Sequence, residues 1–225
     1  MQNLFAKHLG LAEHQVRVLT KDVGGSFGIK VHTYADEMAT VALSKLLKRP
    51  VKFTATRTES LLSDYQGRDL YSRVSLALSR DGKFLGLRAD NISNVGALCS
   101  SLSPLGKGSG LVTGSYDIPA AHLRARAVFT NTMVTQAYRS SGRPEVNFAI
   151  ERLVDAAAKV LGIDRVELRR RNLLTQAELP YTNPWGMIYD SGAYHNVMDQ
   201  ALRLGQWDTF HERRAEARKR GKCRG

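Results

Sequence analysis

The chain has 225 residues, with 33 lysines and arginines against 21 aspartates and glutamates, so its formal net charge is +12. Hydrophobic residues make up 43% of it and charged residues 24%, which is typical of a globular protein and excludes a disordered or collagen-like chain. Two cysteines, Cys99 and Cys223, are too few for a disulfide scaffold. No apolar run is long enough to cross a membrane and the first residues lack the pattern of a signal peptide, so we expect a soluble, cytoplasmic protein with no membrane partner.

The first predicted elements surround a glycine-rich turn. Residues 16–21 alternate apolar and polar side chains, which predicts a strand, and they lead into the turn DVGGSFGIK at 22–30. Apolar residues then recur at helical spacing over 34–47, where we expect a helix that Pro50 terminates. The short segment 51–54 is predicted to be another strand.

The middle of the chain is predicted to hold a hairpin and one further strand. Two alternating segments flank the pair Asp81-Gly82, which favours a tight turn, and together they predict a hairpin over 74–87. The serine- and glycine-rich residues 98–116 are too irregular for a helix, so we expect a long loop there. Alternation returns at 123–129 and predicts a strand.

The second half of the chain is predicted to be helical. Apolar residues between Glu145 and Leu161 recur at helical spacing and indicate an amphipathic helix. Asp164 is placed to cap a short basic helix that ends near Leu174. The remaining expected elements are, in chain order, a loop over 180–192 and helices over 193–204 and 206–220.

These elements together predict an α/β fold, or α+β in a strict scheme, with a mixed sheet and helices packed on it. We expect one domain over 1–225, strand-rich over 1–143 and helical over 144–225. The chain stops at Lys-Cys-Arg-Gly without a helix cap or an apolar closing segment, so we expect a truncated chain.

Two segments rich in small residues are candidates for binding an anionic ligand. DVGGSFGIK lies between a predicted strand and a predicted helix, where backbone amides can meet phosphate or oxo groups, although a plain tight turn also explains it. QAYRSSGRPE, at 136–145, has Arg139 and Arg143 on either side of small residues, where they could hold an anion or form surface ion pairs. Neither segment matches a P-loop or a serine hydrolase motif, and the six histidines lack metal-ligand spacing.

Several motifs occur in an order and spacing that carry more information than each does alone. They are DVGGSFGIK, YDIP at 116–119, AVFTNT at 127–132, AYRSSGRPE with the helix after it, LRRRNL at 168–173 and YDSG at 189–192. In the order and spacing of these motifs, nearly the whole sequence resembles the molybdopterin-binding large subunit of the molybdenum hydroxylases. This family includes xanthine oxidase, aldehyde oxidase and carbon monoxide dehydrogenase. The resemblance implies the fold of that family's first molybdopterin cofactor-binding domain.

The resemblance also implies a cofactor site. Backbone amides of the first loop would face an apical ligand of the molybdenum; the loop residues are Gly24, Gly25, Ser26, Phe27 and Gly28. Arg139 would lie on the other side of the metal, with Ser140 and Ser141 lining the substrate side as the active-site loop. The family binds molybdenum through the dithiolene of molybdopterin, in bacteria usually as the cytosine dinucleotide, so no protein side chain is expected to ligate the metal.

Departures from the family pattern restrict the implied substrate. Copper-containing carbon monoxide dehydrogenases have a cysteine where this chain has Ser140, and a hydroxyl cannot replace a soft thiolate for Cu(I). Purine-oxidising members have a glutamate at the position of Val31 and an aromatic residue at that of Ser141. The resemblance therefore favours hydroxylation of an aldehyde or an N-heteroaromatic compound with water as the oxygen source, although similar sequences are often labelled carbon monoxide dehydrogenase large chain.

The implied partners follow from electron transfer. Two cysteines cannot hold a [2Fe–2S] cluster, so the resemblance implies an iron–sulphur subunit or domain and an FAD subunit or domain, besides the rest of the large subunit. The family's glutamate base and most cofactor anchors would lie beyond Gly225, so the chain alone is expected to be inactive.

Two alternatives to the enzyme hypothesis stay open. One is a non-catalytic interaction domain of the same complex. The other is a basic nucleic-acid-binding module, suggested by the +6 charge of residues 213–225. No aromatic-interleaved or zinc-finger pattern accompanies that charge, so nucleic acid is the less favoured partner.

Overall fold

The computed structural model describes residues 1–225, which form two compact units that alternate along the chain. Unit 1 consists of Met1–Ser72, Asp90–Ser109 and Arg124–Val146. Unit 2 consists of Arg73–Ala89, Gly110–Leu123 and Asn147–Gly225. The chain therefore passes from one unit to the other several times.

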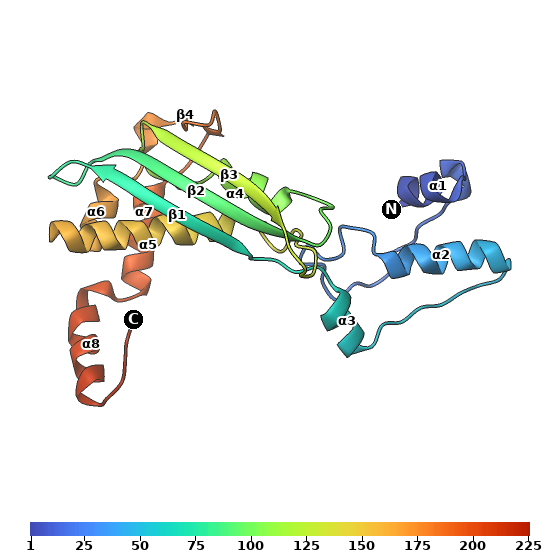
Figure 1. The fold of residues 1–225 in the computed structure, drawn as a ribbon. Helices are drawn as coiled ribbons and strands as arrows, with labels where there is room; N and C mark the ends of the chain where they lie inside the picture. Colours follow the sequence, from blue (N-terminus) through green and yellow to red (C-terminus); the bar gives the residue numbers. More distant parts are fainter. The chain divides into compact units, whose positions relative to one another are not determined.

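Helices and strands are both present (Figure 1), which confirms the predicted α/β class. The helices are α1 (Gln2–Leu9), α2 (Ala35–Leu47), α3 (Arg57–Ser63), α4 (Ser103–Ser109), α5 (Arg143–Leu161), α6 (Arg165–Arg170), α7 (Tyr194–Leu204) and α8 (Phe210–Lys219). The strands are β1 (Leu70–Leu78), β2 (Phe84–Gly96), β3 (Ala121–Phe129), β4 (Tyr181–Thr182) and β5 (Ile188–Tyr189). A three-stranded sheet has the order β1-β2-β3, and β4 pairs antiparallel with β5. No helix is both long enough and apolar enough to span a bilayer.

Most of the strongly periodic segments form the elements that the sequence predicts. Helix α2 starts one residue later than expected, and α5 has the predicted end at Leu161. The hairpin is confirmed as β1 and β2, joined by a turn in which the Ser79 amide donates to the Lys83 carbonyl at 2.9 Å. Strand β3 lies where the alternation predicts it, and helices α7 and α8 lie within the ranges expected for them. A period sustained over many residues therefore predicts these elements well.

Five expectations about local structure are wrong. Residues 16–21 and 51–54 are not strands, because a strand needs a hydrogen-bonded neighbour and neither segment belongs to a sheet. The expected loop 98–116 contains α4, and the expected loop 180–192 contains β4 and β5. Helix α6 ends at Arg170, before Leu174. Helices α1 and α3 lie in segments for which we predicted no element.

Unit 1 is held together largely by polar contacts. Its buried apolar side chains are few, and residues 7–72 contain none that is fully buried. Asn94 instead links three parts of the chain, because its Nδ2 donates to Asp69 Oδ2 at 2.7 Å and to Thr132 Oγ1 at 2.8 Å. Its Oδ1 accepts a hydrogen bond from the Gly96 amide at 2.8 Å. Hydrogen bonds of this one side chain thus join β2 to the residues just before β1 and just after β3.

Unit 2 has a conventional apolar core around α5. Ile150, Val154 and Ala158 recur every fourth residue on this helix, and all three are buried. The Tyr116 ring meets Phe84 edge-on at 5.4 Å, and its hydroxyl donates to Glu151 Oε1 at 2.8 Å. Burial, and then the adjacent carboxylate, raise the pKa of Tyr116 above the ordinary value, so this hydroxyl stays protonated as a donor.

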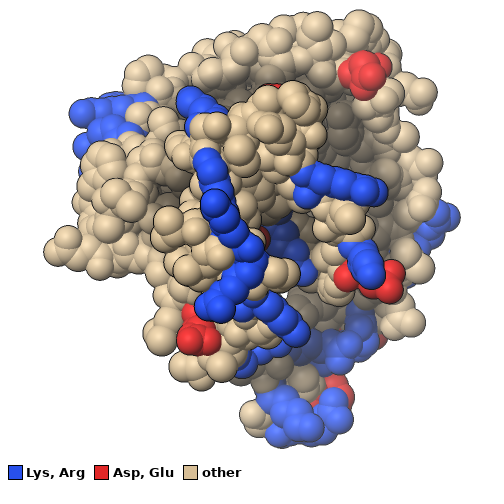
Figure 2. All heavy atoms as spheres, turned by 90° about the vertical axis from the view of Figure 1, so that its right-hand side faces the viewer, with Lys and Arg blue, Asp and Glu red and all other residues tan.

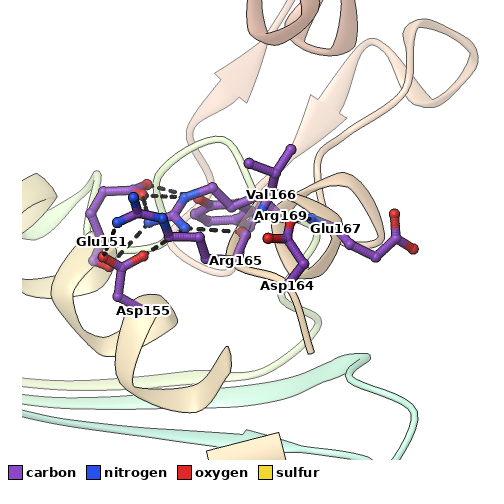
Figure 3. Close-up of polar contacts among 8 residues, drawn as sticks. Glu151, Asp155, Asp164, Arg165, Val166, Glu167 and Arg169 are labelled. Carbon is purple, nitrogen blue, oxygen red and sulfur yellow. Dashed lines mark hydrogen bonds and ion pairs between the residues drawn. The ribbon is translucent and has the colours of Figure 1, made fainter. Parts of the chain in front are cut away.

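Helix α6 is capped at its N-terminus and bonded to α5 through one side chain (Figure 3). Asp164 Oδ1 accepts hydrogen bonds from the amides of Val166 at 2.8 Å and Glu167 at 3.0 Å, which confirms the predicted cap. Arg169 then reaches α5, where its Nε donates to Glu151 at 2.9 Å and its Nη1 to Asp155 at 2.8 Å. These charge-assisted hydrogen bonds align the two helices.

A buried amide, Asn172, joins the end of α6 to the β1–β2 turn. Its Oδ1 accepts from the Phe84 amide at 2.8 Å. Its Nδ2 donates to the carbonyl oxygens of Gly82 and Leu168, both at 2.8 Å. The side chain is 1% exposed, so these groups have no access to replacement water.

We therefore expect Asn172→Ala to lower the free energy of unfolding by about 3 kcal/mol, because it leaves three buried backbone groups without partners. Urea denaturation measures this loss. Asn196→Ala is the matched control, because Asn196 is exposed and accepts only from Gln200, at 3.1 Å. Equal effects of the two substitutions would contradict the role of Asn172.

Candidate functional site

The two predicted ligand-binding segments lie side by side in unit 1. The Arg139 amide donates to the Phe27 carbonyl at 2.8 Å, which joins the first loop directly to the second. A Cβ atom at Gly28 would lie 2.2 Å from the Ala137 carbonyl oxygen. The backbones therefore approach so closely that only glycine fits at residue 28.

Both loops have a left-handed backbone at several positions. The positive φ angles are 116° at Gly25, 50° at Phe27, 105° at Gly28, 69° at Ser140, 39° at Ser141 and 88° at Gly142. Phe27, Ser140 and Ser141 are not glycine, and such residues cost about 1–3 kcal/mol each in this conformation. Strained backbone of this kind clusters at ligand-binding and catalytic sites, so its presence on both loops supports a functional role.

Helix α4 supports the second loop. The Ser141 hydroxyl lies 3.1 Å from that of Ser103, and Ser141 is buried. A Cβ atom at Gly142 would lie 1.7 Å from the Pro104 carbonyl oxygen, and one at Gly108 would lie 2.6 Å from the Gly142 carbonyl oxygen. The backbones of α4 and the second loop thus approach so closely that only glycine fits at residues 108 and 142.

The candidate residues differ in exposure. Arg139 and Ser140 are exposed, and so is Phe27, with 53% of its surface accessible. Ser141 is buried, and its hydroxyl forms a hydrogen bond with the hydroxyl of Ser103. Arg143 is exposed at the start of α5, where its amide donates to the Ser140 carbonyl at 3.2 Å. A ligand on this surface would therefore meet Phe27, Arg139 and Ser140 before Ser141.

The loops offer backbone donors. The amides of Ile29, Arg139 and Ser141 are used in backbone hydrogen bonds, whereas those of Gly25, Phe27 and Gly28 are not among these donors. No group of three or more His, Cys, Asp or Glu side chains is arranged to hold a metal ion. The N–H groups of the loops can thus bind oxygen anions.

Positive charge is not confined to the C-terminal tail. Figure 2 shows lysine and arginine side chains outnumbering acidic ones on the face that it presents. Within unit 1, the segment from Lys45 to Arg57 contains five lysines and arginines and no acidic residue. The surface charge therefore does not single out the tail as a nucleic-acid site.

The fold and the paired loops together describe an α/β domain with a candidate ligand-binding surface. A family model described as "Molybdopterin cofactor-binding domain" matches residues 1–173, and the chain belongs to this family. This confirms the resemblance carried by the GGSFG and AYRSSGR motifs.

Individual relatives extend over almost the whole chain. The carbon monoxide dehydrogenase large chain of Hydrogenophaga pseudoflava is 36% identical over 93% of this chain and 27% of that protein. Subunit gamma of the 6-hydroxypseudooxynicotine dehydrogenase complex of Paenarthrobacter nicotinovorans is 34% identical over 98% of this chain and 29% of that protein. The chain thus spans less than a third of the length of these relatives.

Solved structures show the same fold. Quinoline 2-oxidoreductase from Pseudomonas putida 86 matches with a TM-score of 0.92 and 33% identity, over 98% of this chain and 28% of that one. The Cu,Mo-CO dehydrogenase in its carbon monoxide reduced state matches with a TM-score of 0.89 and 35% identity, over 98% and 29% of the two chains. Both comparisons confirm the α/β architecture of the cofactor-binding domain.

We expect Gly28→Ala to lower the free energy of unfolding by about 3 kcal/mol, because the new methyl group meets the Ala137 carbonyl and the residue needs a positive φ. Gly24→Ala is the control, since a Cβ atom there meets nothing within 4 Å, and we expect a change within about 0.5 kcal/mol. Chemical denaturation of both variants measures the difference. A tolerated Gly28→Ala would mean that the loops can move apart.

A partly buried tyrosine follows the first loop and contacts it. The Tyr34 hydroxyl donates to the Ile29 carbonyl at 2.8 Å, and its ring stacks on Tyr65 at 4.4 Å. Burial raises the pKa of Tyr34 to about 12 from 10.0. A raised tyrosine pKa favours the folded protein below the unfolded value, and this stabilisation disappears as the pH rises from 10 to 12.

We accordingly expect the wild type to lose more stability between pH 10 and 12 than Tyr34→Phe does. Phenolate absorbance should also show a titration step at about 12 that Tyr34→Phe lacks. Tyr71→Phe serves as the control, because Tyr71 is 62% exposed. The same loss of stability in the wild type and Tyr34→Phe would disprove the assignment.

Proposed function

We propose that this chain is part of a molybdenum hydroxylase and that its two loops face the molybdopterin cofactor. The observation that supports this most directly is the hydrogen bond from the Arg139 amide to the Phe27 carbonyl at 2.8 Å. It brings together the two segments that the family resemblance assigns to opposite sides of the molybdenum. The family membership is consistent with this assignment.

The residues present fit such a cofactor. Gly24, Gly25 and Gly28 have no side chains that would block a close approach, and the amides of this loop can donate to oxygen atoms. Arg139 adds a positive charge on the second loop. When bound, the molybdenum centre would supply the two-electron oxidation and the transfer of an oxygen atom derived from water. The chain's own contribution is to orient the cofactor and to stabilise negative charge on oxygen.

We further propose the cytosine dinucleotide form of molybdopterin and an aldehyde or N-heteroaromatic substrate. The exposed Ser140 supports this choice over carbon monoxide, because its hydroxyl is a poor ligand for Cu(I). The structural match to a quinoline oxidoreductase agrees with an N-heteroaromatic substrate.

Partners are part of the same proposal. Cys99 and Cys223 are both exposed and unpaired, so this chain lacks the four thiolates of a [2Fe–2S] cluster. We propose that an iron–sulphur protein and an FAD protein carry electrons away, that residues 1–225 act as the first cofactor-binding domain of the large subunit, and that the assembly works in the cytoplasm. The relative named as a dehydrogenase complex subunit supports an assembly of several chains.

Purification of the tagged protein together with its partners tests this proposal. We expect molybdenum in proportion to this chain, iron, FAD and a cytosine nucleotide released by acid. Dye reduction is expected with an aldehyde or quinoline, and none with carbon monoxide. In this assembly, Arg139→Ala should lower activity by about 10–100-fold, because the arginine adjoins the cofactor.

Arg126→Ala provides the control for the loss of a charge. Arg126 lies in β3, outside both loops, and pairs with Asp90 at 2.9 Å, so activity should stay unchanged. An assembly without molybdenum would overturn the proposed function. Molybdenum accompanied by oxidation of carbon monoxide would overturn the substrate assignment alone.

A further inference from the structure

Arg68 contacts the second loop at several points, although no sequence motif singles it out. Its Nη1 lies 3.0 Å from Glu145 Oε2, in the first turn of α5. Its Nη2 donates to the Arg139 carbonyl oxygen, and its guanidinium lies 5.1 Å from the centre of the Tyr138 ring. The Arg68 side chain therefore contacts Arg139 itself and one residue on either side of it in the sequence, Tyr138 and Glu145.

The backbone around Arg68 is itself fixed to the stem of this loop. The Gln66 amide donates to the Val134 carbonyl at 3.0 Å, and the Gln136 amide donates to the Gln66 carbonyl at 2.8 Å. A Cβ atom at Gly67 would lie 2.8 Å from Tyr138 Cβ, which leaves no space between the two segments. Two hydrogen bonds and a close contact thus hold the backbone that precedes Arg68 against the stem of the second loop.

The conformation of Arg68 argues for a role of its side chain. Its φ angle is 65°, in the left-handed region that glycine and asparagine adopt more easily than arginine. An arginine here therefore costs backbone energy that glycine would avoid. The side-chain contacts offset this cost, and the Glu145 partner is only 12% exposed, so the ion pair is partly shielded from water.

We propose that Arg68 is a positioning residue that holds the Arg139 carbonyl and the Tyr138 ring, so that Arg139 and Ser140 present one fixed arrangement to the cofactor. This inference rests on the proposed function for its consequence in catalysis. Its structural part concerns only the order of the second loop. The two parts can therefore be tested separately.

Hydrogen exchange of the purified protein, followed by mass spectrometry, tests the structural part. The amides of Arg139, Ser141 and Arg143 donate to the Phe27, Tyr138 and Ser140 carbonyls, and this protects them. In Arg68→Ala, we expect their exchange to speed up by about tenfold or more, because a charged donor is lost from the loop. Exchange in α2, which lies elsewhere in unit 1, should stay unchanged.

Two further variants, Arg68→Gly and Arg126→Ala, are measured in the same hydrogen-exchange experiment. Arg68→Gly removes the guanidinium and relieves the strained φ, so it should fold at least as stably as Arg68→Ala and still exchange fast in the loop. Arg126→Ala should exchange like the wild type. Wild-type exchange in both Arg68 variants, or faster exchange throughout unit 1 including α2, would overturn the proposal.

The purified assembly tests the consequence in catalysis. Loss of Arg68 should lower kcat more than it raises KM, and it should alter the electron paramagnetic resonance signal of the bound molybdenum, with Arg68→Lys intermediate in both. Fast loop exchange with an unchanged signal and unchanged kcat would overturn the positioning role while the proposed function stands. If the wild type holds no molybdenum, the proposed function fails, and the exchange measurement still decides whether Arg68 orders the loop.

Discussion

The close approach of the backbones at Gly28 and Ala137 is the constraint on which the candidate site depends. Residue 28 has no room for a Cβ atom, and the neighbouring Phe27 carbonyl accepts a hydrogen bond from the Arg139 amide. Two loops more than a hundred residues apart in sequence thereby become a single surface. The left-handed residues on both sides follow from this contact, because a chain that must turn sharply beside another backbone leaves the common regions of φ. Strain at Phe27, Ser140 and Ser141 is thus a consequence of how the site is assembled.

The fold could be predicted from the sequence where periodicity is long and local. Helix α5 buries Ile150, Val154 and Ala158 on one stripe, and that stripe is visible in the sequence. The segments at 16–21 and 51–54 have an equally clear alternation, yet alternation describes only the faces of a strand and says nothing about a partner. Helix α4 is the opposite case, because a helix forms where the serine- and glycine-rich composition predicts a loop.

The candidate site could be located from its sequence motifs, whereas the residues that hold its loops in place could not be predicted. GGSFG and AYRSSGR contain the residues that meet, and their small side chains already indicate close backbone contact. The residues that hold them are different in kind. Ser103 contacts Ser141 from α4, a helix that we did not predict from the sequence. Arg68 contacts Glu145, which is 77 residues further along the chain. Such pairs have no local pattern, because a single side-chain contact leaves no period in the sequence.

The interleaving of the two units has a consequence for the order in which a ribosome can complete them. Every residue of unit 1 has been made once Val146 has been added, whereas unit 2 begins at Arg73 and needs residues far beyond that point. The Gly82 carbonyl and the Phe84 amide belong to a hairpin that is synthesised early, yet both bind the side chain of Asn172. Asn172 is added about ninety residues after Gly82, so the two groups lack this partner until then. At roughly 5–20 residues per second, the nascent chain carries an unfinished second unit for several seconds, an interval in which chaperones can bind its exposed apolar residues.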